Sequence, residues 1–182
     1  MSLDEKLEKR RKRAEEDVRE AHRNVRRLVQ RFAADPESWK RSIGNGWSPA
    51  ETLLHLAMVG GVVADALRVC AAAGPVQRDR TRSVQQAAAL RLLLTTWRHP
   101  SGPPPLAGTD PQGRLESPDL VAGHHVAWAS GFVALLRDHS GPYLAGVMSK
   151  HPKYGDLDAF EWARWMRIYF RYHELRMSVR TG

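Results

Sequence analysis

The chain has 182 residues, enough for one domain with a substantial core, here residues 1–182, and too few for two full domains. Its hydrophobic content of 42% excludes a disordered chain, and the lone Cys70 excludes an internal disulfide, which suits a reducing cytosol. Charged residues crowd the N-terminus from Asp4 onward, and charge interrupts the longest apolar stretch (53–74). We therefore expect a cytoplasmic protein with no membrane partner.

The formal net charge of +8 owes much to the basic run KRRKR at residues 9–13. Such a run can bind phosphates, but acidic residues precede and follow it at helical spacings of three and four. Pairs of this kind keep a helix face exposed and solvated. No aromatic platform or recognition motif accompanies the run. We therefore expect no nucleic-acid partner, and binding through this run is the weaker alternative.

Helical patterns account for most of the chain, and the first covers about residues 3–33. The second helix opens at WSPAE, where Ser48 and Glu51 form a capping box, and it runs to about residue 73. Two adjacent glycines inside it are best explained by the close approach of a neighbouring helix. In the first helix the apolar residues recur every three or four positions, which predicts a stripe that packs on other helices: Ala14, Val18, Ala21, Val25, Leu28 and Phe32.

Ser83 with Gln86 predicts the start of a third helix, VQQAAALRLLLTTW. The prolines and glycines of the following PSGPPPLAGTDPQGRLE exclude regular structure. A loop of that length is either a lid at the mouth of a pocket or a plain linker.

A fourth helix is expected over residues 118–138, with Leu120, Val121, Trp128, Phe132, Leu135 and Leu136 toward the core. A second loop, HSGPYLAGVMSKHPKYGDL, leads to a last helix that Asp158 and Glu161 cap. No strand alternation is convincing in any segment. Long amphipathic helices joined by loops predict an all-α fold of the helix-bundle type.

Two of the eight histidines lie on stripes that must turn inward. His55 shares its stripe with Glu51, Met58, Val59, Val62 and Ala66; His173 shares its stripe with Trp162, Trp165, Met166, Tyr169 and Met177. Imidazoles that point into one core from separate helices are how metal sites in bundles are built. The alternative is a pair of buried histidines bonded to a carbonyl or carboxylate, and spacing alone favours it. Surface or capping roles are expected for His22, His99, His124, His125 and His139.

Two motifs carry a resemblance to a known family. GWSPAETLLHLA, with His55 eighth from Ser48, resembles the second-helix motif of the DinB-like superfamily, the damage-inducible and YfiT-like bundle proteins. HPKYGDLDAFEWARWMRIYFRYHELRM resembles the C-terminal motif of one uncharacterised branch, HPxYGxLxxxEW followed by a histidine-bearing helix. The resemblance implies an up-down-down-up four-helix bundle with a long crossover and an extra short helix. It also implies a homodimer, since the family often forms one.

The resemblance further implies a metal site. Family members typically hold zinc or nickel on three histidines, and some are thiol-dependent transferases or isomerases that use a low-molecular-weight thiol. The ligand positions fall on His55, Tyr169 and His173, so a tyrosine replaces the middle histidine. A phenol must lose a proton to bind a divalent metal, which costs roughly 4 kcal/mol from pH 7. We therefore expect a depleted site with weak metal binding or none.

The sequence leaves the reaction and the substrate open. The first reading is an ancestral thiol-dependent enzyme that acts on a small molecule, with His55 or His173 as a general base if the metal is lost. The second is a non-catalytic bundle that binds a small ligand in a pocket lined by Trp162 and Met166, or has a structural role only. His151 matches the His-Pro turn of the family motif, and we expect it to be structural.

Overall fold

The structure is a computed structural model that describes residues 1–42, 46–76, 82–96 and 106–178. The described part is mostly helical, as predicted. In chain order its elements are α1 (Leu3–Ala33), α2 (Pro36–Lys40), α3 (Pro49–Ala72), α4 (Val84–Thr96), α5 (Pro118–Asp138), α6 (Gly141–Gly146), β1 (Met148–His151), β2 (Gly155–Asp158) and α7 (Ala159–Ser178).

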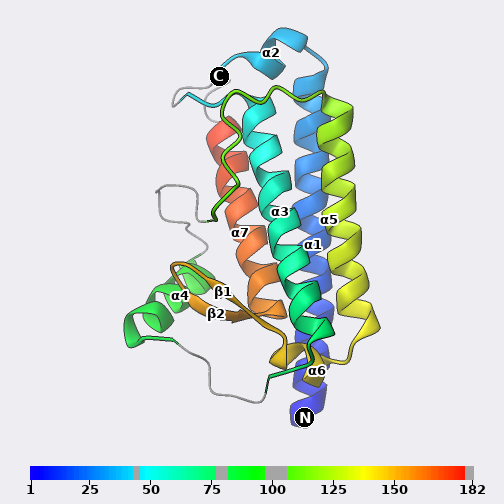
Figure 1. The fold of residues 1–182 in the computed structure, drawn as a ribbon, viewed down its shortest axis with the longest axis vertical. Helices are drawn as coiled ribbons and strands as arrows, with labels where there is room; N and C mark the ends of the chain where they lie inside the picture. Colours follow the sequence, from blue (N-terminus) through cyan, green and yellow to red (C-terminus); the bar gives the residue numbers. More distant parts are fainter. Residues whose placement is uncertain (43–45, 77–81, 97–105, 179–182) are drawn as a thin grey trace.

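Four long helices, α1, α3, α5 and α7, lie side by side (Figure 1). In this view α1 and α7 ascend, while α3 and α5 descend. α1 packs on both α5 and α7, and α3 packs on α5. The connection from α3 to α5 joins opposite ends of the bundle, and α4 lies within it and contacts α7. The first half of α3 and the second half of α7 therefore share one end of the bundle.

The helix ends follow from local capping, as the sequence predicts. Ser48 and Glu51 form the expected capping box at α3, with the Ser48 N–H 2.8 Å from the Glu51 carboxylate. At α4, Ser83 and Gln86 exchange two bonds of 3.0 and 3.1 Å. At α7, the Asp158 carboxylate accepts the backbone N–H of Glu161 at 2.8 Å. All six residues of the predicted stripe on α1 are buried.

The close approach expected at the glycines of α3 is found at Gly60 alone. A Cβ atom built there would stand 2.6 Å from the Trp128 ring of α5, so a side chain at this position would force the helices apart. Gly61 faces open space. Two residues predicted to point inward are instead exposed, Val62 by 43% and Leu120 by 51%. Val62 lies on a face of α3, and Leu120 on a face of α5, that no described helix covers.

The expectation that no strand would form is wrong. β1 pairs with β2 in an antiparallel hairpin, and the tight turn between them has Gly155 at a φ of +72°. His151 accepts the Lys153 N–H at 3.0 Å and so fixes the turn. Every residue of β2 is buried. The predicted loop also contains the short helix α6, which Ser140 caps.

Two of the helices, α3 and α5, are long and apolar enough to cross a membrane by length and composition. The mean hydropathy of their most apolar windows is 1.7 and 1.2. Core helices of globular proteins pass the same test, and here both helices pack within the bundle. The finding is therefore weak evidence for a membrane span.

Candidate functional site

The three predicted site residues meet inside the bundle, although they come from two helices. His55 stands on α3, whereas Tyr169 and His173 stand one turn apart on α7. The ring centroids of His55 and His173 are 5.5 Å apart, and the Tyr169 ring is 4.7 Å from that of His173. His55 and Tyr169 are buried, and His173 is half-buried. The inward stripes therefore converge on one cluster, as the sequence predicts.

Both ring nitrogens of His55 are engaged. Nδ1 lies 2.5 Å from the backbone carbonyl oxygen of Thr109, and Nε2 lies 2.7 Å from the hydroxyl oxygen of Tyr169. A carbonyl oxygen can only accept, so Nδ1 carries the proton. In the neutral ring Nε2 is then an acceptor, and the Tyr169 hydroxyl donates to it. The phenol therefore occupies the lone pair that a metal ion would need.

Burial decides the protonation state of this pair. Desolvation lowers the pKa of His55 below its ordinary value, against the opposing effects of the Thr109 carbonyl and the charge of Asp110. Desolvation also raises the pKa of the Tyr169 phenol well above its ordinary value, and neighbouring Tyr172 adds to this effect. At neutral pH His55 is uncharged and Tyr169 keeps its proton. The pair is an ordinary neutral hydrogen bond in a dry site.

This arrangement fits a divalent metal poorly. The Nδ1–carbonyl bond of His55 is the kind that orients metal-binding histidines, so half of such a site is present. However, the raised pKa of Tyr169 adds to the cost of about 4 kcal/mol for ionising a free phenol at pH 7. Among the described residues, no group of three or more His, Cys, Asp or Glu side chains is placed to hold a metal ion.

The second part of the predicted long loop, residues 106–116, forms a cover over the site. Residues 106–116 have no regular structure, in agreement with the prediction, and residues 97–105 lie outside the described part of the chain. Glu51 accepts the Gly113 N–H at 3.0 Å, one helical turn before His55 binds the Thr109 carbonyl. Two successive inward positions of α3 thus hold this segment. The sequence analysis missed Thr109, because the bond to His55 is made by its backbone carbonyl, which residues of every type possess.

The residues predicted to line a pocket are buried next to this cluster. Trp162 donates its indole N–H to the Ser149 carbonyl at 3.2 Å and meets Trp165 edge-on, and Met166 is fully buried. Trp165 in turn stacks on Tyr169, with ring centroids 4.8 Å apart and an interplanar angle of 12°. These contacts place the two predicted residues in the core. A ligand pocket lined by them stays a prediction.

The structure corrects the expected surface role of His125. Its side chain is buried, Nε2 donates to the Leu53 carbonyl at 2.9 Å, and Nδ1 accepts the Trp128 indole N–H at 2.9 Å. Burial lowers the pKa of His125 to about 3, so the ring is neutral. The sequence showed only that the rings of the adjacent His124 and His125 point in different directions. His124 is the exposed one, and its Nε2 lies 3.1 Å from the Glu116 carboxylate.

The remaining histidines divide between core and surface. His151, expected to be structural, is buried and accepts backbone N–H groups within its hairpin turn. His139 stacks on Tyr143 at the end of α5, with ring centroids 4.4 Å apart. His22 lies edge-on to Trp128 and is partly buried, and His99 falls outside the described residues.

Comparisons with protein-family models, curated proteins and solved structures found no match to this chain.

Proposed function

We propose that this protein is a DinB-like bundle whose metal site is depleted and whose ancestral chemistry was that of a divalent-metal, thiol-dependent transferase or isomerase. In the present chain the site is a closed cluster of His55, Tyr169 and His173 that binds zinc or nickel weakly or not at all. The hydrogen bond from the Tyr169 hydroxyl to His55 Nε2 carries this proposal, because it fills the position of the metal.

Several features of the fold support the DinB-like assignment. Two pairs of oppositely directed long helices and a long crossover between α3 and α5 agree with the up-down-down-up bundle implied by the sequence motifs (Figure 1). The Thr109 carbonyl orients His55 as a metal ligand would be oriented. Full burial of His55 and Tyr169 favours a non-catalytic structural or ligand-binding role over enzymatic activity.

The proposal is tested by metal analysis of protein purified without chelators. We expect far less than one equivalent of zinc or nickel in the wild type. Tyr169→His would supply a third imidazole one turn before His173, and we expect this variant to take up close to one equivalent of zinc. About one equivalent of tightly held metal in the wild type would refute the depleted site. Failure of the variant to gain metal would count against the ancestry.

A metal-free enzyme is the second candidate, and the position of His173 favours it. His173 is partly buried with Nε2 inside the protein, whereas the whole of His55 has no exposed surface, so His173 is the more open residue of the two. A general base must be accessible in this way. Modification with diethyl pyrocarbonate, mapped by mass spectrometry, should label His173 and spare His55. An unlabelled His173 would exclude it as a base toward small molecules.

A further inference from the structure

A surface groove of about 420 Å³ lies far along the bundle from the histidine cluster, where the first half of α1 meets the start of α7 and the end of α4. Three arginines line it: Arg10 and Arg13 from α1 and Arg164 from α7. Leu94 of α4 and Phe160 of α7 supply its apolar wall. A cationic rim beside an apolar wall is a combination that the proposed function does not use.

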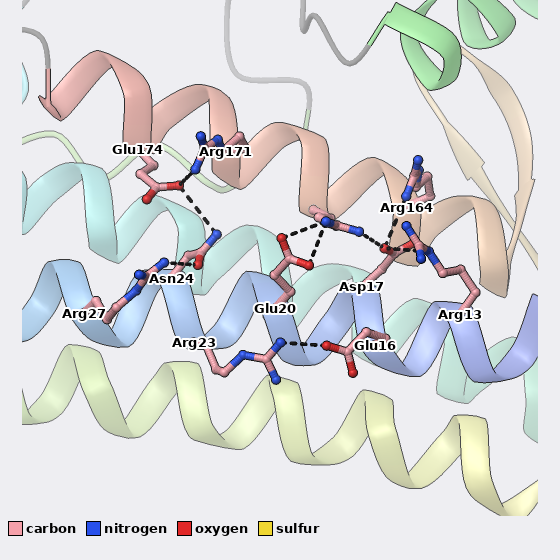
Figure 2. Close-up of polar contacts among 11 residues, drawn as sticks. Arg13, Glu16, Asp17, Glu20, Arg23, Asn24, Arg27, Arg164, Arg171 and Glu174 are labelled. Carbon is pink, nitrogen blue, oxygen red and sulfur yellow. Dashed lines mark hydrogen bonds and ion pairs between the residues drawn. The ribbon is translucent and has the colours of Figure 1, made fainter.

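The carboxylates of the groove are already bound to arginines of the protein. Asp17 is buried, with its side chain 2% exposed, and lies 2.6 Å from Arg167 and 3.3 Å from Arg164 (Figure 2). Glu161 accepts both terminal nitrogens of Arg82, at 2.6 and 3.2 Å. These acidic groups are therefore neutralised from within the protein, and they offer little to repel an incoming anion.

Arg13 is the arginine of the groove whose N–H groups are best placed to bind a ligand. Its only ion pair among the described residues joins Nε to Asp17 at 3.7 Å, the longest of the three contacts to that carboxylate. The side chain is 60% exposed, so its terminal nitrogens face the groove or solvent. A guanidinium presents two parallel N–H donors, which match the two oxygens of a carboxylate or phosphate.

Arg10 joins the cationic rim to the apolar wall. One of its terminal nitrogens binds the buried Asp158 at 3.0 Å, while the guanidinium lies 4.7 Å from the centre of the Phe160 ring. Phe160 is 5% exposed and its ring face is covered by this guanidinium, so the partly buried Leu94 supplies most of the apolar contact that the groove offers. The bond to Asp158 fixes the guanidinium in place, so the site is organised before a ligand arrives.

We infer that this groove binds a small amphipathic anion: a phosphate or carboxylate group held by Arg13 and Arg10, attached to an aromatic or aliphatic group that packs on Leu94 beside Phe160. The wall from α4 favours a compact ligand over a nucleic-acid strand, which would need an open basic face with aromatic platforms. The ionic contact is with a single group, so binding depends on salt only modestly.

Phenyl phosphate, inorganic phosphate and a single-stranded DNA dodecamer are suitable probes for isothermal titration calorimetry at low salt. We expect saturable binding of one phenyl phosphate per chain, and weaker binding of inorganic phosphate because it lacks the apolar contact. Arg13→Gln should weaken phenyl phosphate binding by about tenfold or more. Arg68→Gln is the matched control, because Arg68 is 74% exposed and lies on α3, away from the groove.

A second variant tests the apolar half of the site. Leu94→Ala should weaken phenyl phosphate and leave inorganic phosphate unchanged, and the ratio of the two affinities makes the result independent of any small loss of stability. Absence of saturable binding, or an equal loss in Arg13→Gln and Arg68→Gln, would overturn the inference. Tighter binding of the dodecamer than of phenyl phosphate would also overturn it and favour a nucleic-acid surface.

Discussion

At the scale of single residues, two buried tyrosines differ in one respect. The Tyr169 hydroxyl donates to His55 Nε2 at 2.7 Å, whereas the buried Tyr154 hydroxyl has no hydrogen-bond partner among the described residues. Removing the first hydroxyl strands a buried acceptor, which costs about 1–3 kcal/mol. Removing the second strands nothing. We therefore expect Tyr169→Phe to lower the free energy of unfolding and Tyr154→Phe to leave it nearly unchanged.

Urea unfolding of both variants at pH 7.5 checks this prediction, because the two changes delete the same atom from equally buried rings. An equal loss of stability in both variants would mean that the Tyr169–His55 bond contributes nothing beyond packing. A loss confined to Tyr154→Phe would contradict the proposed tautomer of His55.

His125 makes the stability of the fold depend on pH. Its folded pKa of about 3 lies below the unfolded value of 6.5, so the unfolded chain binds the proton more readily. Stability from this residue is complete above pH 6.5 and is lost as the pH falls toward 3. Between pH 7.5 and 5 the loss amounts to about 2 kcal/mol.

The variant His125→Gln isolates this contribution from that of other titrating groups. A glutamine amide can accept from Trp128 and donate to the Leu53 carbonyl, but it does not titrate. We expect it to be less stable than the wild type at pH 7.5, and the difference to shrink by about 2 kcal/mol at pH 5. A difference that stays constant between the two pH values would show that His125 is not the responsible group.

The sequence predicted the histidine cluster only in part at this scale. The helical stripes indicated that His55 and His173 point inward, because periodicity fixes the face of a long amphipathic helix. Tyr169 followed from its place one turn before His173. The bond to Thr109 was not predictable, because it depends on how residues 106–116 pass over α3, and the burial of His125 was missed because two adjacent histidines give no sign of which one turns inward.

At the scale of elements, local chemistry determined what could be predicted. Helix starts were predicted well because Ser48, Ser83 and Asp158 cap their helices through bonds that span only three residues. The hairpin was missed because MSKH and GDLD contain lysine, glycine and aspartate, which are rare in strands. Its stability comes instead from tertiary contacts, such as the buried Leu157 and the bond from Trp162 to Ser149.

α4 is attached more weakly than the four long helices, and this yields a prediction of its own. Its buried residues are Leu90 and Leu93, and the residue before its N-cap, Arg82, binds Glu161 and the Asp156 carbonyl. Few buried contacts mean a low free energy for local opening. We expect Arg82→Met to raise amide hydrogen exchange across α4 by about tenfold, which corresponds to the loss of one strong charge-assisted contact.

Amide exchange in other helices of the same molecule provides the control for this experiment. Exchange in the middle of α1 and α5 should stay unchanged, because these helices do not depend on Arg82 for packing. Arg68→Gln, which removes an exposed ion pair with Asp65, should leave α4 exchange at the wild-type rate. Faster exchange throughout the bundle would show that Arg82 supports the global fold and not α4 alone.

At the scale of the whole molecule, the chain has a net charge of +8, and several of its arginines form ion pairs between α1 and α7. Figure 2 shows Asp17 and Glu20 of α1 facing arginines of α7, with Glu174 and Asn24 meeting further along the same interface. Part of the basic run is also engaged, since Arg10 binds Asp158, the last residue of β2 and the cap of α7. Arg10, Arg164 and Arg167 therefore help to hold α1 against β2 and α7.

Asp17 and Glu16 are adjacent on α1 and provide a test of this arrangement. Asp17 is buried and contacts three arginines, of which Arg167 also binds Glu20. Asp17→Ala removes the carboxylate that these arginines share, and we expect a loss of about 3 kcal/mol in the free energy of unfolding. Glu16 forms an exposed pair with Arg23, and Glu16→Ala should cost less than about 1 kcal/mol.

The measurement is urea unfolding at about 0.05 and 0.5 M NaCl. Salt screens exposed charges far more than buried ones, so only the Glu16 effect should vanish at high salt. A loss at Asp17 that salt abolishes would mean that water reaches this carboxylate and that α1 and α7 are held by apolar packing alone.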